Sequence, residues 1–153
     1  MAKLVDAGHE WAAEIGRIVI AFGGIEHVTV LCLRSLPRDP IHKALANLKL
    51  AARIDLLLAI LAGDDSPEAA RLAQLFGKVK SLAVDRNHIV HNPLMLSVFD
   101  SDGELGYVEA IHSLSNANKR LSFAELVQVR EQAEQLATNL YEAAAPLLGG
   151  PKA

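Results

Sequence analysis

Apolar residues recur along this chain at alternating steps of three and four, the spacing of one face of an α-helix. The pattern predicts four helices, over residues 6–36, 40–62, 67–91 and 123–147. The stripe of the first helix comprises Trp11, Ile15, Ile18, Phe22, Ile25, Thr29, Cys32 and Leu36. Further apolar residues cover much of its remaining surface, so we expect this helix to be central or shared with a second subunit. Gly23-Gly24 marks either the close approach of another helix or a kink.

Capping residues support these boundaries. Asp39-Pro40 and Ser66-Pro67 each place a capping side chain before a proline that suits the first turn of a helix. Ser122 and Glu125 form a capping box, with Leu121 and Leu126 as its hydrophobic staple. Pro93 cannot continue the third helix, because its ring would clash with the carbonyl four residues earlier.

The period changes to two between the third and fourth helices. Leu94, Leu96 and Val98 alternate with their neighbours, and an Asp102-Gly103 turn follows, which predicts a β-hairpin over residues 94–111. We therefore predict one domain over residues 1–153. Its fold class is all-α, an antiparallel four-helix bundle with a β-hairpin between the third and fourth helices.

Composition refines this prediction. The chain is 51% hydrophobic, and its mean hydropathy of +0.22 favours self-association, so we expect a homodimer. Its unbroken apolar runs are too short to cross a bilayer and no signal peptide is visible, which predicts a cytoplasmic protein without membrane contact. The single cysteine, Cys32, is expected to be a buried structural thiol. A net charge of −3 provides no global attraction for nucleic acid.

Arg86 lies on the apolar stripe of the third helix, and a permanent cation there requires a partner. Glu26 is the best candidate, because it interrupts the apolar surface of the first helix. A buried Arg86–Glu26 pair that sets how two helices pack is one explanation of both residues.

His91 occupies the final turn of the third helix, where the helix dipole favours a protonated imidazole suited to acid–base chemistry. Asn87 lies four residues earlier on the same face and is placed to orient the ring. Arg86 and His91 are about 140° apart on an ideal helix. They can converge only through the long arginine side chain or through fraying of the helix end. The alternative is that His91 only caps terminal carbonyls.

A metal site is not predicted. Asp85, His88 and His91 drift around the helix instead of sharing a face, and no third ligand is evident for the two histidines. We expect no cofactor.

The segment Arg86-Asn87-x-x-x-His91 resembles the Arg-x4-6-His signature of the HEPN superfamily, and the order of helices is similar over most of the chain. HEPN domains are helical bundles that usually dimerise, and many are metal-independent ribonucleases of toxin or defence systems. The resemblance implies that Arg86 holds the scissile phosphate, that His91 is the acid–base group and that Asn87 positions the pair.

Four other residues complete the candidate site. We expect Glu26 and His88 to support it, and Lys78 and Lys80 to add weaker contacts to substrate phosphate.

Two functional hypotheses remain open. In the first, the protein is a metal-independent endoribonuclease that acts on RNA, with an antitoxin-like protein as a possible partner. In the second, it is a non-catalytic HEPN-like module that binds a protein or small ligand, and Arg86 is structural.

Overall fold

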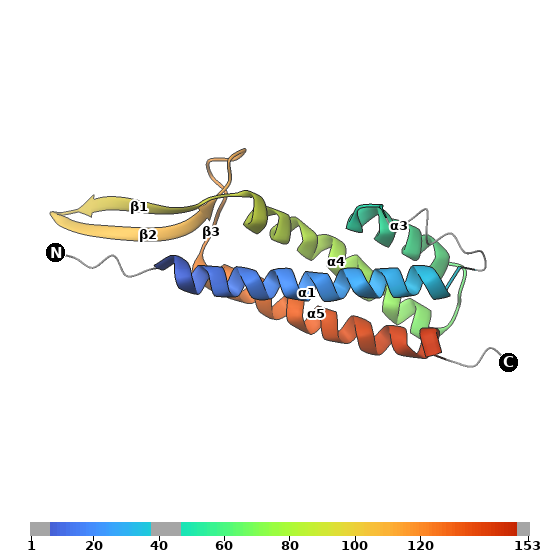
Figure 1. Cartoon of the computed structure of the whole chain (residues 1–153). Coiled ribbons are helices and arrows are strands. Elements are labelled where there is room, and N and C mark those ends of the chain that lie inside the picture. Colours follow the sequence, from blue (N-terminus) through green and yellow to red (C-terminus); the bar gives the residue numbers. More distant parts are fainter. Residues whose placement is uncertain (1–6, 38–46, 150–153) are drawn as a thin grey trace.

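The computed structural model describes residues 7–37 and 47–149, and most of the chain is helical (Figure 1). The helices are α1 (Ala7–Ser35), α3 (Leu50–Leu61), α4 (Pro67–His91) and α5 (Phe123–Gly149). Between α4 and α5 lie the strands β1 (Leu94–Ser101), β2 (Glu104–His112) and β3 (Arg120–Leu121). Within the described residues, the predicted four helices and the β-hairpin between the last two of them are therefore confirmed.

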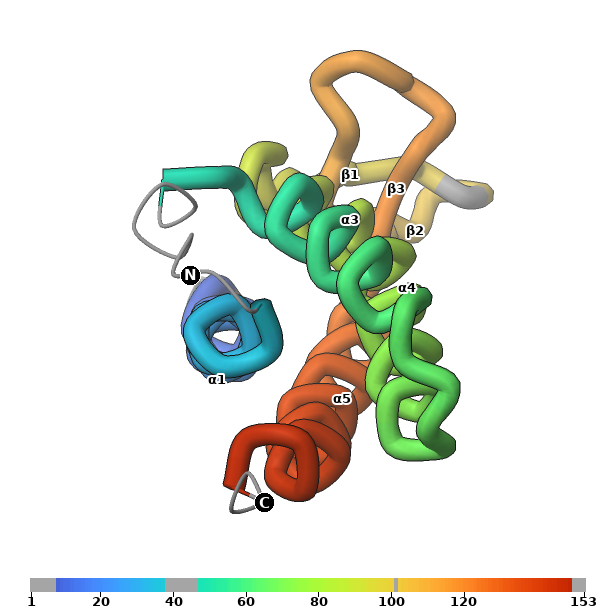
Figure 2. Tube along the Cα trace, turned by 90° about the vertical axis from the view of Figure 1, so that its right-hand side faces the viewer, coloured from blue at the N-terminus to red at the C-terminus, as the bar shows by residue number. Residues whose placement is uncertain are grey.

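Helices α1 and α5 lie side by side and run in the same direction. Glu14 accepts a hydrogen bond from Arg130 at 2.8 Å, and one turn further along both helices Arg17 bonds Glu134, also at 2.8 Å. Figure 2 shows α5 between α1 and α4, with α3 beside α4. The predicted alternation of helix directions is therefore wrong for the first and last helices, because periodicity shows which face is buried but not how a helix is oriented.

The core is built from the predicted stripes. In α1, Trp11, Ile18, Phe22, Ile25 and Cys32 are buried. Burial raises the pKa of the Cys32 thiol to about 12, which suits the predicted structural role. Among the other apolar residues of α1, Val28 and Leu33 are also buried, whereas Val19 is exposed, so the helix is buried over part of its surface only.

The glycine pair in α1 has an asymmetric environment. A Cβ on Gly24 would lie 3.8 Å from the Tyr141 ring and 3.9 Å from Ala137, both on α5, whereas Gly23 has nothing within 4 Å. Helix α1 continues through both positions. Close approach of another helix is therefore the explanation that fits Gly24.

Most predicted helix boundaries are confirmed by hydrogen bonds. The Ser66 hydroxyl accepts from Ala69 N at 3.2 Å, and Pro67 occupies the first turn of α4. The Ser122 hydroxyl accepts from Glu125 N while the Glu125 carboxylate accepts from Ser122 N, which is the predicted capping box. Both staple leucines, Leu121 and Leu126, are buried in the core.

The second helix begins later than predicted. Residues 47–49 are not helical and Lys49 is extended, so α3 starts at Leu50 instead of near residue 40. Its entry is fixed by Arg53, whose Nε donates to the Leu48 carbonyl at 2.9 Å. The predicted Asp39-Pro40 cap lies outside the described residues.

The hairpin forms around the predicted turn. Asp102 and Gly103 both have positive φ, 58° and 87°, as a two-residue type I′ turn requires. β1 pairs antiparallel with β2 from Leu94↔Ile111 to Ser101↔Glu104. The short strand β3 pairs with the end of β2, which the sequence did not predict, and makes a three-stranded sheet. The hairpin projects beyond the helices (Figure 1).

Helix α1 also bears on the predicted localisation. Residues Gly8–Ser35 form a helix that is long and apolar enough to cross a membrane by length and composition, although no unbroken apolar run in the sequence has that length. This is weak evidence for a span, because a core helix passes the same test. Here Trp11, Ile18 and Phe22 are buried within the protein.

The ion pairs between α1 and α5 predict a pH dependence. The Arg17 guanidinium, with help from Arg130, lowers the pKa of Glu134. A carboxylate of this kind stabilises the fold above its unfolded pKa, about 4.3, and this contribution is lost as the pH falls through the folded value. We expect Glu134→Gln to lower the urea midpoint at pH 7 and to differ less from wild type at pH 3.

The matched control for this measurement is Glu142→Gln. Glu142 is on the same helix, but it approaches Arg71 only to 4.0 Å and both side chains are largely exposed, so we expect little change at either pH. An equal loss for Glu134→Gln at both pH values would contradict the ionic explanation.

Candidate functional site at the end of helix α4

Arg86 lies in the penultimate turn of α4, half-buried, with its guanidinium facing α1. Its Cζ is 5.9 Å from the centroid of the Phe22 ring, within the range of a cation–π contact. Nη1 donates to the Asn87 side-chain oxygen at 3.1 Å, whereas the buried Nε has no partner among the described residues. Arg86 also makes no ion pair with any described carboxylate.

The predicted Arg86–Glu26 pair is wrong. Glu26 accepts instead from Arg53 Nη2 of α3 at 3.3 Å, and Arg53 also donates to the Thr29 hydroxyl and the Leu48 carbonyl. Arg53 is only 8% exposed, so it is the more deeply buried cation. A signal was available, because Arg53 lies between Leu50 and Leu57 on an apolar stripe, as Arg86 does on its own helix.

His91 is the last residue of α4 and is exposed. The helix is regular up to His91, and the backbone becomes extended only at Asn92 (φ −125°, ψ 150°). Fraying of the helix end therefore does not move His91 towards Arg86. The two residues are separated by about 140° around the helix and about 7.5 Å along it. A single chain therefore does not bring the two predicted reacting groups together in this conformation.

His88 is buried beside Asn92. The Asn92 amide donates to the His88 carbonyl at 2.7 Å and lies 3.2 Å from His88 Nδ1, while its oxygen accepts from Leu114 N at 2.8 Å. An amide nitrogen can only donate, so Nδ1 accepts and the His88 proton is assigned to Nε2. Asn92 thus ties the end of α4 to the β2–β3 loop, a role that the sequence analysis missed.

Buried orphan nitrogens gather near this end of the molecule. Within the described residues, the buried side-chain atoms without a hydrogen-bond partner are Arg86 Nε, His88 Nε2 and His112 Nε2. His112 is adjacent to the α4 end, because its N–H donates to the Pro93 carbonyl at 3.1 Å. Buried polar groups are normally satisfied, so these three nitrogens have capacity for water or a polar ligand.

The two lysines do not join the motif. Lys80 Nζ lies 2.6 Å from Asp55 of α3, which neutralises it, and Lys78 lies on another side of α4. The two lysines that were predicted to contact substrate phosphate therefore lie on different faces of the helix. Of the predicted phosphate-binding cations Lys78, Lys80 and Arg86, it is Arg86 that is partly buried and has no carboxylate partner among the described residues.

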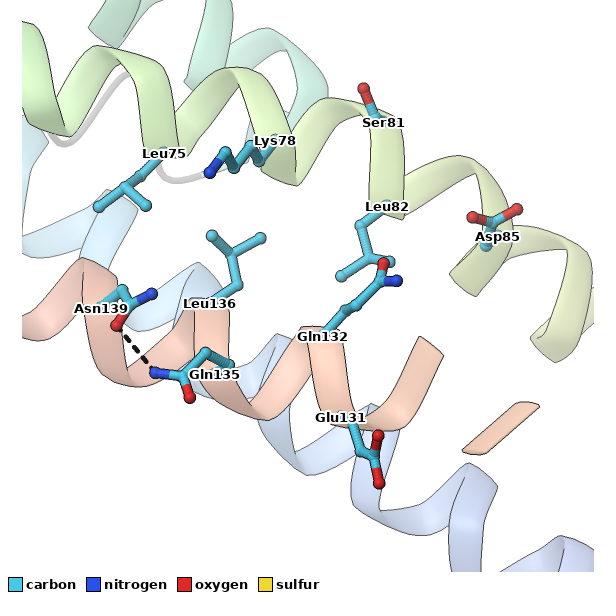
Figure 3. A pocket seen from close by; sticks show the side chains of 10 residues that line it. All are labelled: Leu75, Lys78, Ser81, Leu82, Asp85, Glu131, Gln132, Gln135, Leu136 and Asn139. Carbon is cyan, nitrogen blue, oxygen red and sulfur yellow. Dashed lines mark hydrogen bonds between the residues drawn. The ribbon is translucent and has the colours of Figure 1, made fainter. Parts of the chain in front are cut away.

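A separate groove of about 620 Å³ lies between α4 and α5 (Figure 3). Its apolar floor and its charged rim come from both helices. The residues that define it are Leu75, Leu82 and Leu136 on the floor, and Lys78, Asp85 and Glu131 on the rim. Neither Arg86 nor His91 lines this groove, so it is distinct from the predicted site.

Among the described residues, no three histidine, cysteine or acidic side chains are grouped so that they could hold a metal ion.

No protein-family model, curated protein or solved structure matches this chain.

Proposed function

We propose that this protein is a HEPN-like helical bundle that acts in the cytoplasm as a metal-independent endoribonuclease of toxin or defence type. The observation that supports this most directly is the state of Arg86. It is a half-buried guanidinium held by an aromatic ring and an amide, with no described carboxylate to neutralise it. Such a cation is available to bind an anion, and an RNA phosphodiester is the anion that the motif implies.

Each residue has a distinct role in the proposed reaction. Arg86 binds the non-bridging oxygens of the scissile phosphate, whose negative charge grows in the transition state. Asn87 accepts a hydrogen bond from Arg86 Nη1 and helps to orient the guanidinium. His91 removes the proton from the ribose 2′-OH, which attacks phosphorus. The bond from phosphorus to the 5′ oxygen breaks, and the protonated His91 passes the proton that it took from the 2′-OH to that leaving oxygen.

Atom balance then defines the products. The RNA fragment upstream of the cut carries a 2′,3′-cyclic phosphate, and the downstream fragment carries a 5′-hydroxyl. No water, metal or cofactor enters this step. The separation of Arg86 and His91 requires the guanidinium to leave the Phe22 ring and swing towards the helix end when RNA binds.

The alternative is a non-catalytic HEPN-like module that binds a protein or small ligand. Two observations favour it. Arg86 packs on a core residue, Phe22, as a structural arginine would, and the groove between α4 and α5 offers a binding surface away from the motif. An antitoxin-like protein is a possible partner under the first proposal, and an unidentified protein or small ligand is the partner under the second.

Incubation of purified protein with single-stranded RNA in EDTA tests the enzyme directly. Wild-type protein is expected to produce fragments with 2′,3′-cyclic phosphate and 5′-hydroxyl ends, because the attacking group is the ribose itself. His91→Ala is expected to abolish cleavage without lowering the melting temperature, because His91 is exposed.

His9→Ala is the matched control, since His9 is an exposed histidine on α1, and it is expected to cleave normally. Intact RNA after incubation with wild-type protein would sink the enzyme proposal, as would cleavage that requires a divalent metal.

A further inference from the structure

The hairpin carries most of the exposed large apolar side chains among the described residues. One face presents Leu94, Leu96, Val98, Leu105 and Tyr107. The opposite face presents Met95, Phe99 and Val108. Tyr107 is 72% exposed and Leu105 is 79% exposed, whereas a sheet that packs on its own core buries one of its faces. Apolar side chains exposed on both faces of a projecting hairpin indicate a site of association with another chain.

The outer edge of β1 is open as well. The sheet order is β1-β2-β3, so no described strand pairs with the outer side of β1. Pro93 O accepts a hydrogen bond from His112 N, so these two residues form a hydrogen-bonded pair. Hydrogen-bonded and non-hydrogen-bonded pairs alternate along an antiparallel ladder. The β1 residues whose backbone bonds to β2 are therefore Met95, Ser97 and Phe99.

The residues between them direct their backbone N–H and C=O groups away from β2. These residues are Leu94, Leu96, Val98 and Asp100.

We propose that this edge pairs antiparallel with the same edge of a second copy of the chain, across a two-fold axis at Ser97. This is the one register in which the four outward-facing residues of each copy all bond to those of the other. Leu96 then lies opposite Val98 of the second copy, and Met95 lies opposite its Phe99. Apolar side chains meet apolar side chains on both faces, and thioether–aromatic contacts are favourable.

The edge strand and the charge both suit a second copy. Five exposed apolar side chains lie along β1, beside the edge that would pair, and they supplement the backbone hydrogen bonds of the joined sheet. Three exposed acidic residues, Asp100, Asp102 and Glu104, lie at the hairpin tip, so tip-to-tip pairing is repulsive. The antiparallel register keeps the two tips far apart.

The sequence predicted self-association through helix surfaces, whereas in the structure most of the exposed large apolar side chains lie on the hairpin. In the proposed pairing the two α4 ends lie at opposite ends of the joined sheet. The pairing therefore does not build a shared active site, and it stands or falls independently of RNA cleavage.

Light scattering and crosslinking of the full chain test the pairing. Wild-type protein is expected to elute with twice the chain mass of 16.4 kDa. Val98→Lys places a charge on the paired edge and is expected to weaken dimerisation at least tenfold. Leu105→Lys is the matched control, because Leu105 is on the same face but on β2, away from the edge. Far-UV circular dichroism of each variant confirms that the helices remain folded.

Ser97→Cys tests the register. Residues facing each other in a non-hydrogen-bonded antiparallel pair have Cα atoms about 4.5 Å apart, within the span of a disulfide. Mild oxidation is expected to link Ser97→Cys chains into dimers, and Leu105→Cys chains are expected to stay unlinked. Cys32 is buried and does not compete.

Three results would overturn the proposal. The first is wild-type protein that stays monomeric at the highest concentration at which light scattering is measured. The second is a dimer that Leu105→Lys dissociates as readily as Val98→Lys, which would indicate packing of hairpin faces. The third is a dimer in which Ser97→Cys does not crosslink, which would place the interface elsewhere.

Discussion

Arg86→Ala is expected to lower the rate of RNA cleavage by at least about 100-fold while the protein stays folded. Removal of one donor that stabilises transition-state charge typically costs this much or more. Arg86 makes no described ion pair, so its removal strands no buried carboxylate and the fold should tolerate the change. Initial rates on a single-stranded oligoribonucleotide, measured at equal protein concentrations, provide the comparison.

Two further variants separate a chemical role of Arg86 from a structural one. Arg71→Ala removes an exposed arginine from the same helix, with only a 4.0 Å contact to Glu142, and is expected to cleave at the wild-type rate. Arg86→Lys keeps the charge but not the planar fork of donors, so we expect partial activity. If Arg86→Ala cleaves normally and mainly lowers the melting temperature, Arg86 is structural and the binding-module alternative is correct.

Phe22→Ala is expected to lower the free energy of unfolding by about 3–5 kcal/mol, the usual cost of deleting a buried aromatic ring. Phe22 is among the largest fully buried side chains, at 1% exposure. This loss is a large fraction of the roughly 5–15 kcal/mol that stabilises a typical domain. Urea denaturation of the two proteins, followed by circular dichroism, measures it.

Phe22→Leu is the informative companion variant. It largely conserves volume, so its cost should stay below about 1.5 kcal/mol, but it removes the aromatic face that lies near the Arg86 guanidinium. Under the enzyme proposal the freed guanidinium still binds phosphate, so cleavage should persist. A loss as large as that of Phe22→Ala would mean that the Arg86 contact, more than packing volume, holds this part of the core together.

Local patterns were sufficient wherever a single helix or turn was concerned. The predicted ends of α4, the capping box at Ser122 and the Asp102-Gly103 turn all match the structure. Each of these features depends on contacts within a few residues, which the order of amino acids determines by itself. The late start of α3 is the exception. Arg53, in its first turn, bonds to Thr29 and Glu26 on α1, so this end of the helix also involves a distant segment.

Pairings between distant residues could not be predicted in the same way. Two arginines, Arg53 and Arg86, lie on apolar stripes, and the sequence does not show which of them pairs with Glu26. The packing of α3 against α1 brings Arg53 to Glu26. Likewise, Asn92 becomes a link between α4 and Leu114 only once the strands have turned back beside the helix. The residues that surround Glu26 or Asn92 in the sequence are the same whichever distant partner the side chain contacts, so they do not identify that partner.

The amino-acid sequence alone thus determined which segments are helices, where the chain reverses into a hairpin and which positions are buried in α1. The tertiary structure decided that α1 and α5 run in parallel, that Arg86 rests on Phe22 without a described carboxylate and that the hairpin is left uncovered. The physical reason is range. Helix and turn preferences act over three or four residues, whereas ion pairing, helix direction and exposure depend on which segments meet in space.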